Sequence, residues 1–421
     1  MTLERIGQNG WTPGLYSVFR AAFGTYLAAH LVQLLPYAAE LFSSAGMLPD
    51  AALSPFHGAF PNPLALADSP LAVELFVAAS VALAIAFAVG FQDRLAAVGL
   101  WLALASLFNR NPLIANPSLP FVGWLLLAHA SLPSAPYGSW AARAPGSENA
   151  RWQLPASLFA AAWIVMSLGY SYSGLTKLAS PSWLDGSALA RVLENPLARP
   201  LAYREWLLAL PPLALQLASW GGLALELGFA PLALVRRLRP WLWLAMLGMH
   251  VSLMALIDFV DLSLGMVFLH AFTFDPAWIP RARRSGTPPE RVYYDGSCGL
   301  CHGAVRFLLA EDRGGEAFRF AALQGDTAAQ RLSAQDRAAL PDSLVVETTG
   351  GELLTRSRAV LYLAASLGGA WRALAWPAHA VPLRWRDALY DAVARRRRLL
   401  ARAPAGACPI APAEQRSRFD P

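Results

Sequence analysis

The chain of 421 residues has little cysteine, little charge and almost no lysine. Its three cysteines, Cys298, Cys301 and Cys408, are too few for a framework of several disulfides. Charged residues make up 15% of the chain, against about 25% in an ordinary soluble domain, while hydrophobic residues make up 56%. This composition excludes a wholly soluble protein and favours a chain that lies largely in lipid.

The scarcity of charge is confined to the first two thirds of the chain. Residues 1–276 are strongly apolar, residues 277–290 form a linker rich in Pro and Arg, and residues 291–421 have the composition of a soluble domain. We therefore expect an all-α polytopic transmembrane helical domain followed by a soluble α/β domain.

Apolar segments predict about eight membrane spans in the first domain. Several are shorter than the roughly 20 residues that a bilayer requires, so we expect them to be tilted or shielded by neighbouring helices. The segments lie near residues 14–36, 71–91, 95–108, 119–132, 154–175, 206–235, 241–257 and 262–274.

Arginines gather in alternate loops of this arrangement, and the long loop at residues 37–70 has neither Lys nor Arg. The positive-inside rule then places both termini in the cytoplasm. We predict an integral protein of a bacterial-type inner membrane, whose soluble domain is cytoplasmic. The net charge of +6 is explained by contact with the anionic lipids of the bilayer, and no nucleic-acid partner is expected.

Two of the three cysteines lie in one short segment, residues 291–307, whose pattern predicts a strand, a turn and a helix. The strand is expected at Val292–Tyr294 and the helix at Ala304–Ala310. Cys298 then lies at or just before a helix N-terminus, where the helix dipole favours a thiolate. This placement predicts Cys298 as a nucleophile and Cys301, one turn later, as the cysteine that resolves a mixed disulfide.

Three other interpretations of the cysteine pair remain open. The two cysteines could be structural, and Cys298–His302 also spells the Cys-x-x-Cys-His motif of c-type haem attachment. Zinc requires four ligands, and this half of the chain offers only His302, His379 and Cys408 besides the pair. We therefore expect no metal site.

A longer pattern surrounds the two cysteines. It comprises Tyr294, Asp295, Gly296, Cys298 and Cys301, then Val305, Phe307 and Leu308, and later Phe320, Leu323 and Gln324. This pattern resembles the DCC family of thiol-disulfide oxidoreductases, named for its Asp and two Cys, over residues 291–419. The resemblance implies a thioredoxin-like fold without a cofactor, a protein or small-molecule disulfide as substrate, and Asp295, Cys298 and Cys301 as the catalytic residues.

The remaining pattern of the second domain fits thioredoxin-like α/β order. Pro341 precedes a predicted strand, where thioredoxin-like folds place a cis-proline facing the dithiol, and we expect a cis-proline there. We also expect aromatic core packing of Trp371, Trp376 and Trp385, near an amphipathic helix, with a contact at the membrane surface as the alternative. Strands are predicted at 318–323, 343–348 and 352–355, and helices at 327–332, 357–367 and 383–400.

Lys177 is the only lysine; the other 33 basic residues are arginines. Arginine serves equally well for surface charge but cannot lose its proton, whereas a desolvated lysine can become a base. We therefore predict a functional Lys177, with a chance survivor or a snorkelling anchor as alternatives. Because charges at membrane depth need partners, we predict an interior polar cluster in which Glu226 and His250 approach one another near Tyr170.

A second resemblance rests on residues around this lysine. They are Ser173, Gly174, Lys177 and Leu178, then Trp183 and Gly186, with Glu226 and His250 in later spans. They resemble the membrane domain of vitamin K-dependent gamma-carboxylases, the HTTM family, over residues 14–276. The resemblance implies that Lys177 acts as a base toward a quinol. Where carboxylases carry Asn-His-Ser, however, this chain has Asn116–Ser118, and their large carboxylase domain is missing.

Together the two domains predict a membrane-anchored thiol-disulfide oxidoreductase. We expect the membrane domain to bind a quinone or quinol near Lys177. The alternatives are a gamma-carboxylase-like lyase, a haem-bearing electron carrier, and a non-enzymatic membrane scaffold.

Overall fold

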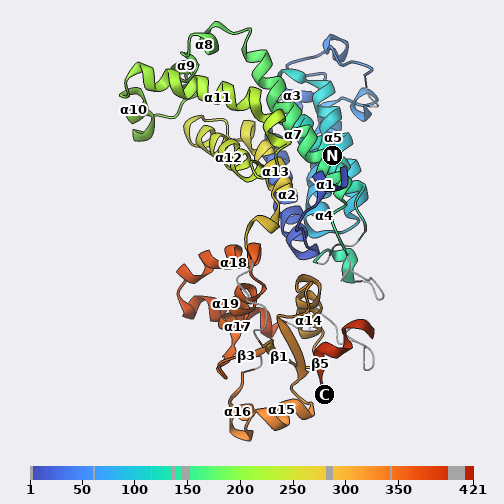
Figure 1. Ribbon diagram of the computed structural model, residues 1–421. Coiled ribbons are helices and arrows are strands. Elements are labelled where there is room, and N and C mark those ends of the chain that lie inside the picture. The colour runs from blue at the N-terminus through green and yellow to red at the C-terminus, as the bar shows by residue number, and fades with distance from the viewer. Residues whose placement is uncertain are drawn as a thin grey trace.

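The computed structural model describes residues 3–59, 62–114, 116–134, 136, 138–143, 152–280, 288–341, 344–396 and 413–421. A large helical region is followed by a smaller region with a mixed α/β sheet (Figure 1). This arrangement confirms the expected order of a mostly helical part and an α/β part. Cys408 and residues 281–287 of the linker lie outside the described residues.

Each apolar segment of the first region forms a helix, and several helices have Pro in their first turn, where its missing N–H costs nothing. The helices are α2 (Pro13–Leu34), α4 (Pro70–Val89), α5 (Asp93–Arg110), α6 (Leu119–Ala130), α7 (Ala156–Lys177), α11 (Pro212–Ala233), α12 (Arg239–Leu256) and α13 (Asp261–Thr273). Shorter helices are α1 (Leu3–Gly7), α3 (Ala38–Phe42), α8 (Pro181–Leu184), α9 (Ala188–Glu194) and α10 (Ala202–Leu208).

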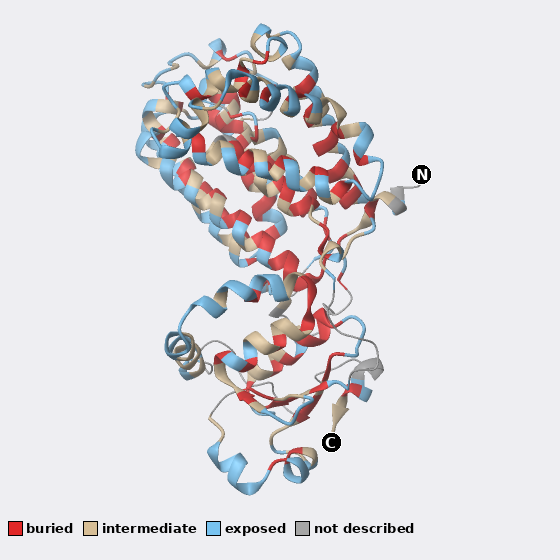
Figure 2. Ribbon diagram, turned by 60° about the vertical axis from the view of Figure 1, so that its left-hand side comes forward, coloured by how far each residue is buried: buried red, intermediate tan, exposed pale blue. Residues whose placement is uncertain are grey.

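Within the described residues, four helical stretches are long and apolar enough to cross a membrane, so the predicted count of about eight spans is not confirmed. The four are Pro13–Phe42, Pro70–Val89, Ala156–Lys177 and Pro212–Ala233. Buried residues concentrate where the helices meet (Figure 2), yet the outer faces are also apolar and expose large side chains. A helix that is apolar all round is suited to a lipid environment. Examples of the exposed side chains are Leu71, Leu75, Leu95, Leu168, Leu217 and Leu244.

Arginines and the C-terminal region share one end of the helical region. Arg236 donates to Gln8 Oε1 and Arg239 to the carbonyl oxygen of Ile6, both at 3.0 Å. These contacts join the loop between α11 and α12 to the beginning of the chain. The N-terminus of α2 also lies against the C-terminal region, through contacts described below. We call this the basic end.

The C-terminal sheet has the strand order β4-β3-β1-β2-β5. β1 and β2 are parallel, as are β2 and β5, whereas β3 is antiparallel to both β1 and β4. The strands are β1 (Glu290–Tyr294), β2 (Phe318–Ala322), β3 (Val345–Glu347), β4 (Leu353–Thr355) and β5 (Phe419–Asp420). The helices are α14 (Gly299–Glu311), α15 (Asp326–Arg331), α16 (Ala334–Ala339), α17 (Arg356–Leu367), α18 (Gly369–Ala375) and α19 (Leu383–Arg395).

The core of this region is formed by apolar runs of the central strands. Val292, Phe318, Phe320 and Val346 are fully buried, as expected where both faces of a sheet are covered. The strands and helices predicted here are present, with shifted boundaries. The sequence did not predict β5, α16 or α18.

The expected cis-proline at position 341 is wrong. No peptide bond among the described residues is cis, and the bond before Pro341 is one of them. Trans is the default for X-Pro, by about 0.5–1 kcal/mol in peptides.

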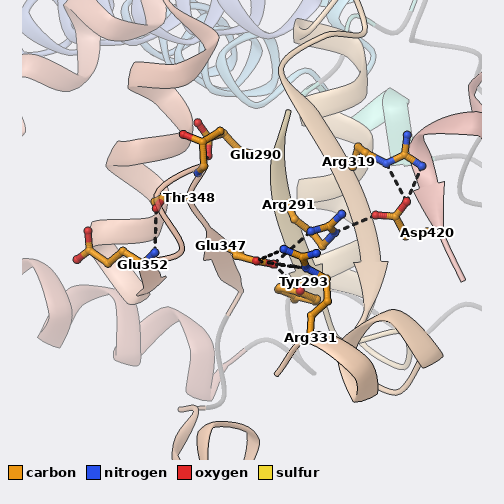
Figure 3. A network of polar contacts seen from close by, with 10 residues as sticks. Glu290, Arg291, Tyr293, Arg319, Arg331, Glu347, Thr348, Glu352 and Asp420 are labelled. Atoms are coloured by element: carbon orange, nitrogen blue, oxygen red, sulfur yellow. Dashed lines mark hydrogen bonds and ion pairs between the residues drawn. The ribbon is translucent and has the colours of Figure 1, made fainter. Parts of the chain in front are cut away.

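Charged residues tie the last strand to the sheet (Figure 3). Arg319 and Arg291 both donate to Asp420, and Arg291 and Arg331 pair with Glu347. Hydrogen bonds from Arg331 above all lower the pKa of Glu347 to about 2, against the opposing effect of burial. Burial likewise opposes ionisation of Asp420, but hydrogen bonds from the two arginines outweigh it and lower its pKa.

The two regions meet at Glu311, the last residue of α14. Its Oε1 accepts a hydrogen bond from the backbone N–H of Gly14 at 2.8 Å, and its Oε2 accepts from Thr12 Oγ1 and from Trp371 Nε1. Because α2 begins at Pro13, the carboxylate occupies the N-terminus of that helix, where free N–H groups and the helix dipole favour an anion. Burial nevertheless raises the pKa of Glu311. We call this contact the junction.

Candidate functional site

The two cysteines of the dithiol segment lie at the start of α14. Cys298 is the residue directly before the helix, with an extended backbone, and Cys301 lies in the first turn. Both are free thiols. Cys298 is only 8% exposed, while Cys301 is partly exposed. The predicted position of Cys298 at the helix N-terminus is therefore present, although this sulfur is the less accessible of the two.

The surroundings of Cys301 disfavour its ionisation. Burial, the hydrogen bond with Cys298 and the charge on Cys298 raise the pKa of Cys301 to about 12. Cys301 is thus almost wholly a thiol at neutral pH, and a thiol is a poor nucleophile. Attack on a disulfide requires the thiolate, so access alone does not assign the two roles.

Asp295 holds the loop that precedes Cys298. Its Oδ1 accepts hydrogen bonds from the backbone N–H and the hydroxyl of Ser297, at 2.9 and 2.7 Å, and from Gln324 Nε2 at 3.2 Å. Gln324 Oε1 in turn accepts from the N–H of Gly296. The carboxylate of Asp295 therefore holds this loop in place, and its predicted catalytic role stays a prediction. The sequence pattern included Gln324 but did not reveal this contact.

The side chain of His302 contacts the same loop. Its side chain is buried, its Nε2 lies 2.8 Å from the carbonyl oxygen of Gly296, and its ring packs edge-on against Tyr294. A haem iron bound through the Cys-x-x-Cys-His motif would need that imidazole, so this contact favours the dithiol interpretation over haem attachment. Among the described residues, no three His, Cys, Asp or Glu side chains are grouped as metal ligands.

Lys177 forms an ion pair with Glu226 near the end of the helical region remote from the junction. The Nζ atom lies 2.5 Å from both carboxylate oxygens. The Glu226 side chain is only 4% exposed, and the amine also lies 4.5 Å from the centre of the Trp183 ring. A bidentate partner at this distance compensates the cost of a charge at membrane depth.

His250 makes hydrogen bonds with groups other than Glu226, whose carboxylate is paired with Lys177, and the predicted approach of His250 to Glu226 stays a prediction. Tyr170 Oη lies 2.8 Å from Nε2 of His250 and 3.3 Å from Nε2 of His270, while Nδ1 of His250 faces the Ser263 hydroxyl. Tyr170 and Lys177 are seven residues apart and share one face of α7, so an interior polar cluster exists with different pairs. The sequence analysis missed His270.

Two further polar groups lie in the helical region. Asp261 accepts hydrogen bonds from Tyr26 and Asn116 and pairs with His30 at 3.1 Å. In the sequence, the polar residues within the apolar segment at 14–36 indicate that this helix has polar partners. At the basic end, a separate buried chain links Tyr16, His129 and Asp93.

A cavity of about 590 Å³ adjoins the Asp261 group, between α2, α5 and the start of α13. Most of its lining is apolar, including Leu34, Phe42 and Leu107, while His30, Asn116 and Asp261 supply polar atoms. Pockets of this size that combine apolar walls with a few polar groups are typical of ligand sites.

The dithiol and the lysine pair lie at opposite ends of the molecule. Trp152, four residues before α7, accepts a hydrogen bond from Arg313 beside the junction. Lys177 is the last of the 22 residues of that helix, which places it about 33 Å from the start of α7 at 1.5 Å per residue. On the other side, α14 separates the cysteines from Glu311 by 13 residues, about 20 Å. In Figure 1, α8, which follows Lys177, lies at the far end of the helical region from the sheet.

Comparisons with known proteins concern the C-terminal region. The family model described as DCC1-like thiol-disulfide oxidoreductase matches residues 292–403. The uncharacterized protein YuxK of Bacillus subtilis (strain 168) is 35% identical over 114 residues, which are 26% of this chain and 79% of that protein.

A chloroplastic DCC family protein of Arabidopsis thaliana, At1g52590, is 35% identical over 106 residues, which are 25% of this chain and 61% of that protein. No solved structure matches the chain significantly.

Proposed function

Because the chain belongs, through its C-terminal region, to the DCC1-like thiol-disulfide oxidoreductase family, we propose that Cys298 and Cys301 catalyse exchange with a protein or small-molecule disulfide. The observation that carries this proposal is the placement of the pair: Cys298 lies directly before α14 and Cys301 lies in its first turn, where burial and the charge on Cys298 raise the pKa of Cys301 to about 12. Cys298 is thereby suited to attack the substrate disulfide, and Cys301 to resolve the mixed disulfide. The strand order, with β3 antiparallel to its neighbours, supports a thioredoxin-like fold.

The reaction proceeds in two steps. The Cys298 thiolate attacks one sulfur of the substrate disulfide, a mixed disulfide forms, and the other substrate sulfur leaves as a thiolate. Cys301 then loses its proton, attacks the sulfur of Cys298 and releases the second substrate thiolate. The two protein thiols are oxidised to a disulfide while the substrate gains two electrons, and a dithiol donor must reduce the enzyme again.

The direction of electron flow follows from the side of the membrane. The arginines Arg236 and Arg239 lie at the basic end, to which the C-terminal region is attached, and the positive-inside rule assigns such an end to the cytoplasm. In that compartment a dithiol rests reduced. We therefore assign the site the role of a reductant of disulfides in a membrane-anchored protein.

The test is a redox titration of the full-length protein, followed by alkylation of thiols. We expect a reversible two-electron transition in which Cys298 and Cys301 are protected together. Cys298→Ser should abolish the transition, and Cys301→Ser should accumulate mixed disulfide with a model substrate. Two thiols that never pair at any potential would overturn the proposal.

The membrane region supports a second candidate function, binding of a quinone-like molecule. The cavity of about 590 Å³ offers apolar walls for a ring and tail, with hydrogen-bonding groups of His30, Asn116 and Asp261 for a carbonyl or hydroxyl. We place this ligand in the cavity rather than against Lys177, because the amine is already paired with Glu226. The family match does not extend to this region, so gamma-carboxylation stays a prediction without added support.

Equilibrium binding of a short-chain quinone to the detergent-solubilised protein tests this second candidate. Asp261→Asn should weaken binding severalfold, whereas Lys177→Arg should leave it unchanged. The reverse pattern would place the ligand at Lys177, as the sequence had suggested, and binding that neither change affects would reject both places.

A further inference from the structure

The polar face of α19 packs against the C-terminal region. Asp387 accepts a hydrogen bond from the Ser357 hydroxyl at 2.5 Å, and Tyr390 Oη accepts one from the backbone N–H of Leu344 at 3.2 Å. Asp391 pairs with Arg356 at 3.2 Å. These contacts fix the rotation of the helix about its axis, so the face that carries Asp387, Tyr390 and Asp391 points inward.

The apolar face of α19 consequently points outward. Trp385, Leu389 and Val393 are spaced four residues apart and form one stripe; they are 63%, 70% and 44% exposed. In a soluble domain the apolar stripe of an amphipathic helix faces the core, and here the arrangement is inverted. A partner surface is needed to cover it.

The segment that leads into α19 continues the exposed surface. Trp376 is 76% exposed, and Val381 and Leu383 are exposed as well. The expected core packing of Trp376 and Trp385 is therefore wrong. Trp371 alone of the three tryptophans packs inward, against Phe307, and donates to Glu311 at the junction. We call Trp376, Val381, Leu383, Trp385, Leu389 and Val393 the outer apolar face.

The outer apolar face belongs to the part of the sheet domain that borders the membrane region. α18, directly before Trp376, contacts the 3-10 turn Pro276–Trp278, which follows α13. In Figure 1, α18 and α19 lie between the helical region and the sheet, while α15 and α16 lie at the far end. The face thus begins at a contact with the helices that we assign to the bilayer.

Arginines surround this face. Arg384 lies with its guanidinium 5.9 Å from the centre of the Trp385 ring, and Arg395 and Arg396 are exposed at the end of the helix. Tryptophan and leucine on one face, with arginines at the margins, characterise helices that lie in the membrane–water interface. Anionic headgroups on the cytoplasmic leaflet attract such arginines.

We propose that the outer apolar face lies in the headgroup region of the bilayer that the N-terminal helices cross, with its arginines on anionic lipid. The C-terminal region is then held at two places, the junction and this face, and it is not a freely swinging domain. Its cysteines, about 20 Å beyond the junction along α14, are directed toward the aqueous side. The proposal rests on the membrane location of the helical region and not on the dithiol chemistry.

The test uses the full-length protein with its three cysteines replaced by serine, reconstituted in nanodiscs of phosphatidylcholine and phosphatidylserine. Leu389→Cys carries an environment-sensitive bimane label, and Arg337→Cys on the exposed surface of α16 is the matched control at the far end. Lipids with a spin label near the headgroup should quench the label at position 389 at least about twofold more than at 337. Equal quenching at the two positions would overturn the proposal.

A second measurement guards against disturbance by the label. Hydrogen exchange of α19 amides in the otherwise native chain should be slower in anionic nanodiscs than in detergent, and Trp385→Asp should remove the difference. Arg337→Asp is the control and should retain it. Protection that depends on protein concentration in detergent would instead identify a second copy of the chain as the partner and reject the bilayer.

Discussion

The two ends of the molecule bring reactive groups together in different ways. At the dithiol end, Asp295, Cys298 and Cys301 belong to one loop and one helical turn. At the other end, Lys177 and Glu226 are 49 residues apart and meet only because α7 packs along α11. A site of the first kind needs little beyond local structure, whereas a site of the second kind exists only in the assembled helical region.

The largest effect is expected at the dithiol end. Cys298→Ser should reduce disulfide exchange to the uncatalysed rate, because no thiolate remains to attack. Cys301→Ser should leave the first step intact and accumulate a mixed disulfide, visible by mass spectrometry of the intact protein. Exchange at an undiminished rate in Cys298→Ser would assign the attack to Cys301, whose greater exposure would then have decided the roles.

At the lysine end the expected effect is on stability. Glu226→Gln leaves a partly buried ammonium without its counter-ion, so the free energy of unfolding should fall by about 3–5 kcal/mol. Solvation of the Lys177 ammonium by water reduces this loss. The double variant Lys177→Met/Glu226→Leu should lose less than the single one. Thermal unfolding in detergent measures both, with Glu205→Gln on the exposed surface as the control. A double variant less stable than the single one would contradict a dominant role for the pair.

A smaller effect is expected at the junction that joins the two regions. Glu311→Ala removes the acceptor of three hydrogen bonds and should destabilise the contact by about 1–3 kcal/mol. Faster hydrogen exchange at the start of α2 and the end of α14 would report it, and Glu316→Ala on the exposed loop nearby should have no such effect. Unchanged exchange would show that the junction does not hold the regions together.

Opposite pH dependences should distinguish the junction from the sheet. Burial raises the pKa of Glu311, so its stabilising contribution is complete below the unfolded pKa and declines as pH rises through the folded value. The pKa of Glu347 is lowered from 4.5 to about 2, so its contribution is complete above pH 4.5 and is lost as pH falls toward 2.

Urea unfolding of the C-terminal region between pH 2 and pH 5 measures the Glu347 effect. Glu347→Gln should flatten the dependence over that interval. A slope that persists in this variant would assign the acid sensitivity to other carboxyl groups, with Asp420 the first to examine.

The smallest expected effect tests the separation of the two ends. Lys177→Met should leave the rate of disulfide exchange within about twofold of the original, because the lysine pair and the dithiol lie on opposite sides of the junction. A large loss of rate with Cys298 still ionised would show that the membrane region takes part in the redox reaction.

The sequence predicted what depends on neighbours along the chain. The strand, turn and helix around Cys298 and the helical character of the apolar segments both follow from local patterns. Which helices pack together does not, so the pairing of Lys177 with Glu226 and the contact of His270 with Tyr170 were not predicted.

The amphipathic pattern of α19 likewise predicted a helix, but it could not tell which face would pack. That face is decided by Asp387 and Tyr390, whose partners Ser357 and Leu344 lie far away in the sequence. The strand β5 was missed because two residues carry no periodicity, and Asp420 is held there by arginines of β1 and β2.

The solitary lysine has a practical consequence. Acylating reagents react with the neutral form of an amine, and Lys177 carries the only side-chain amine in the protein. Its amine is paired with Glu226, so acylation at this position requires the two side chains to part. The rate at which the peptide containing Lys177 gains the mass of the acyl group would then report how often the helical region opens, without any engineered probe.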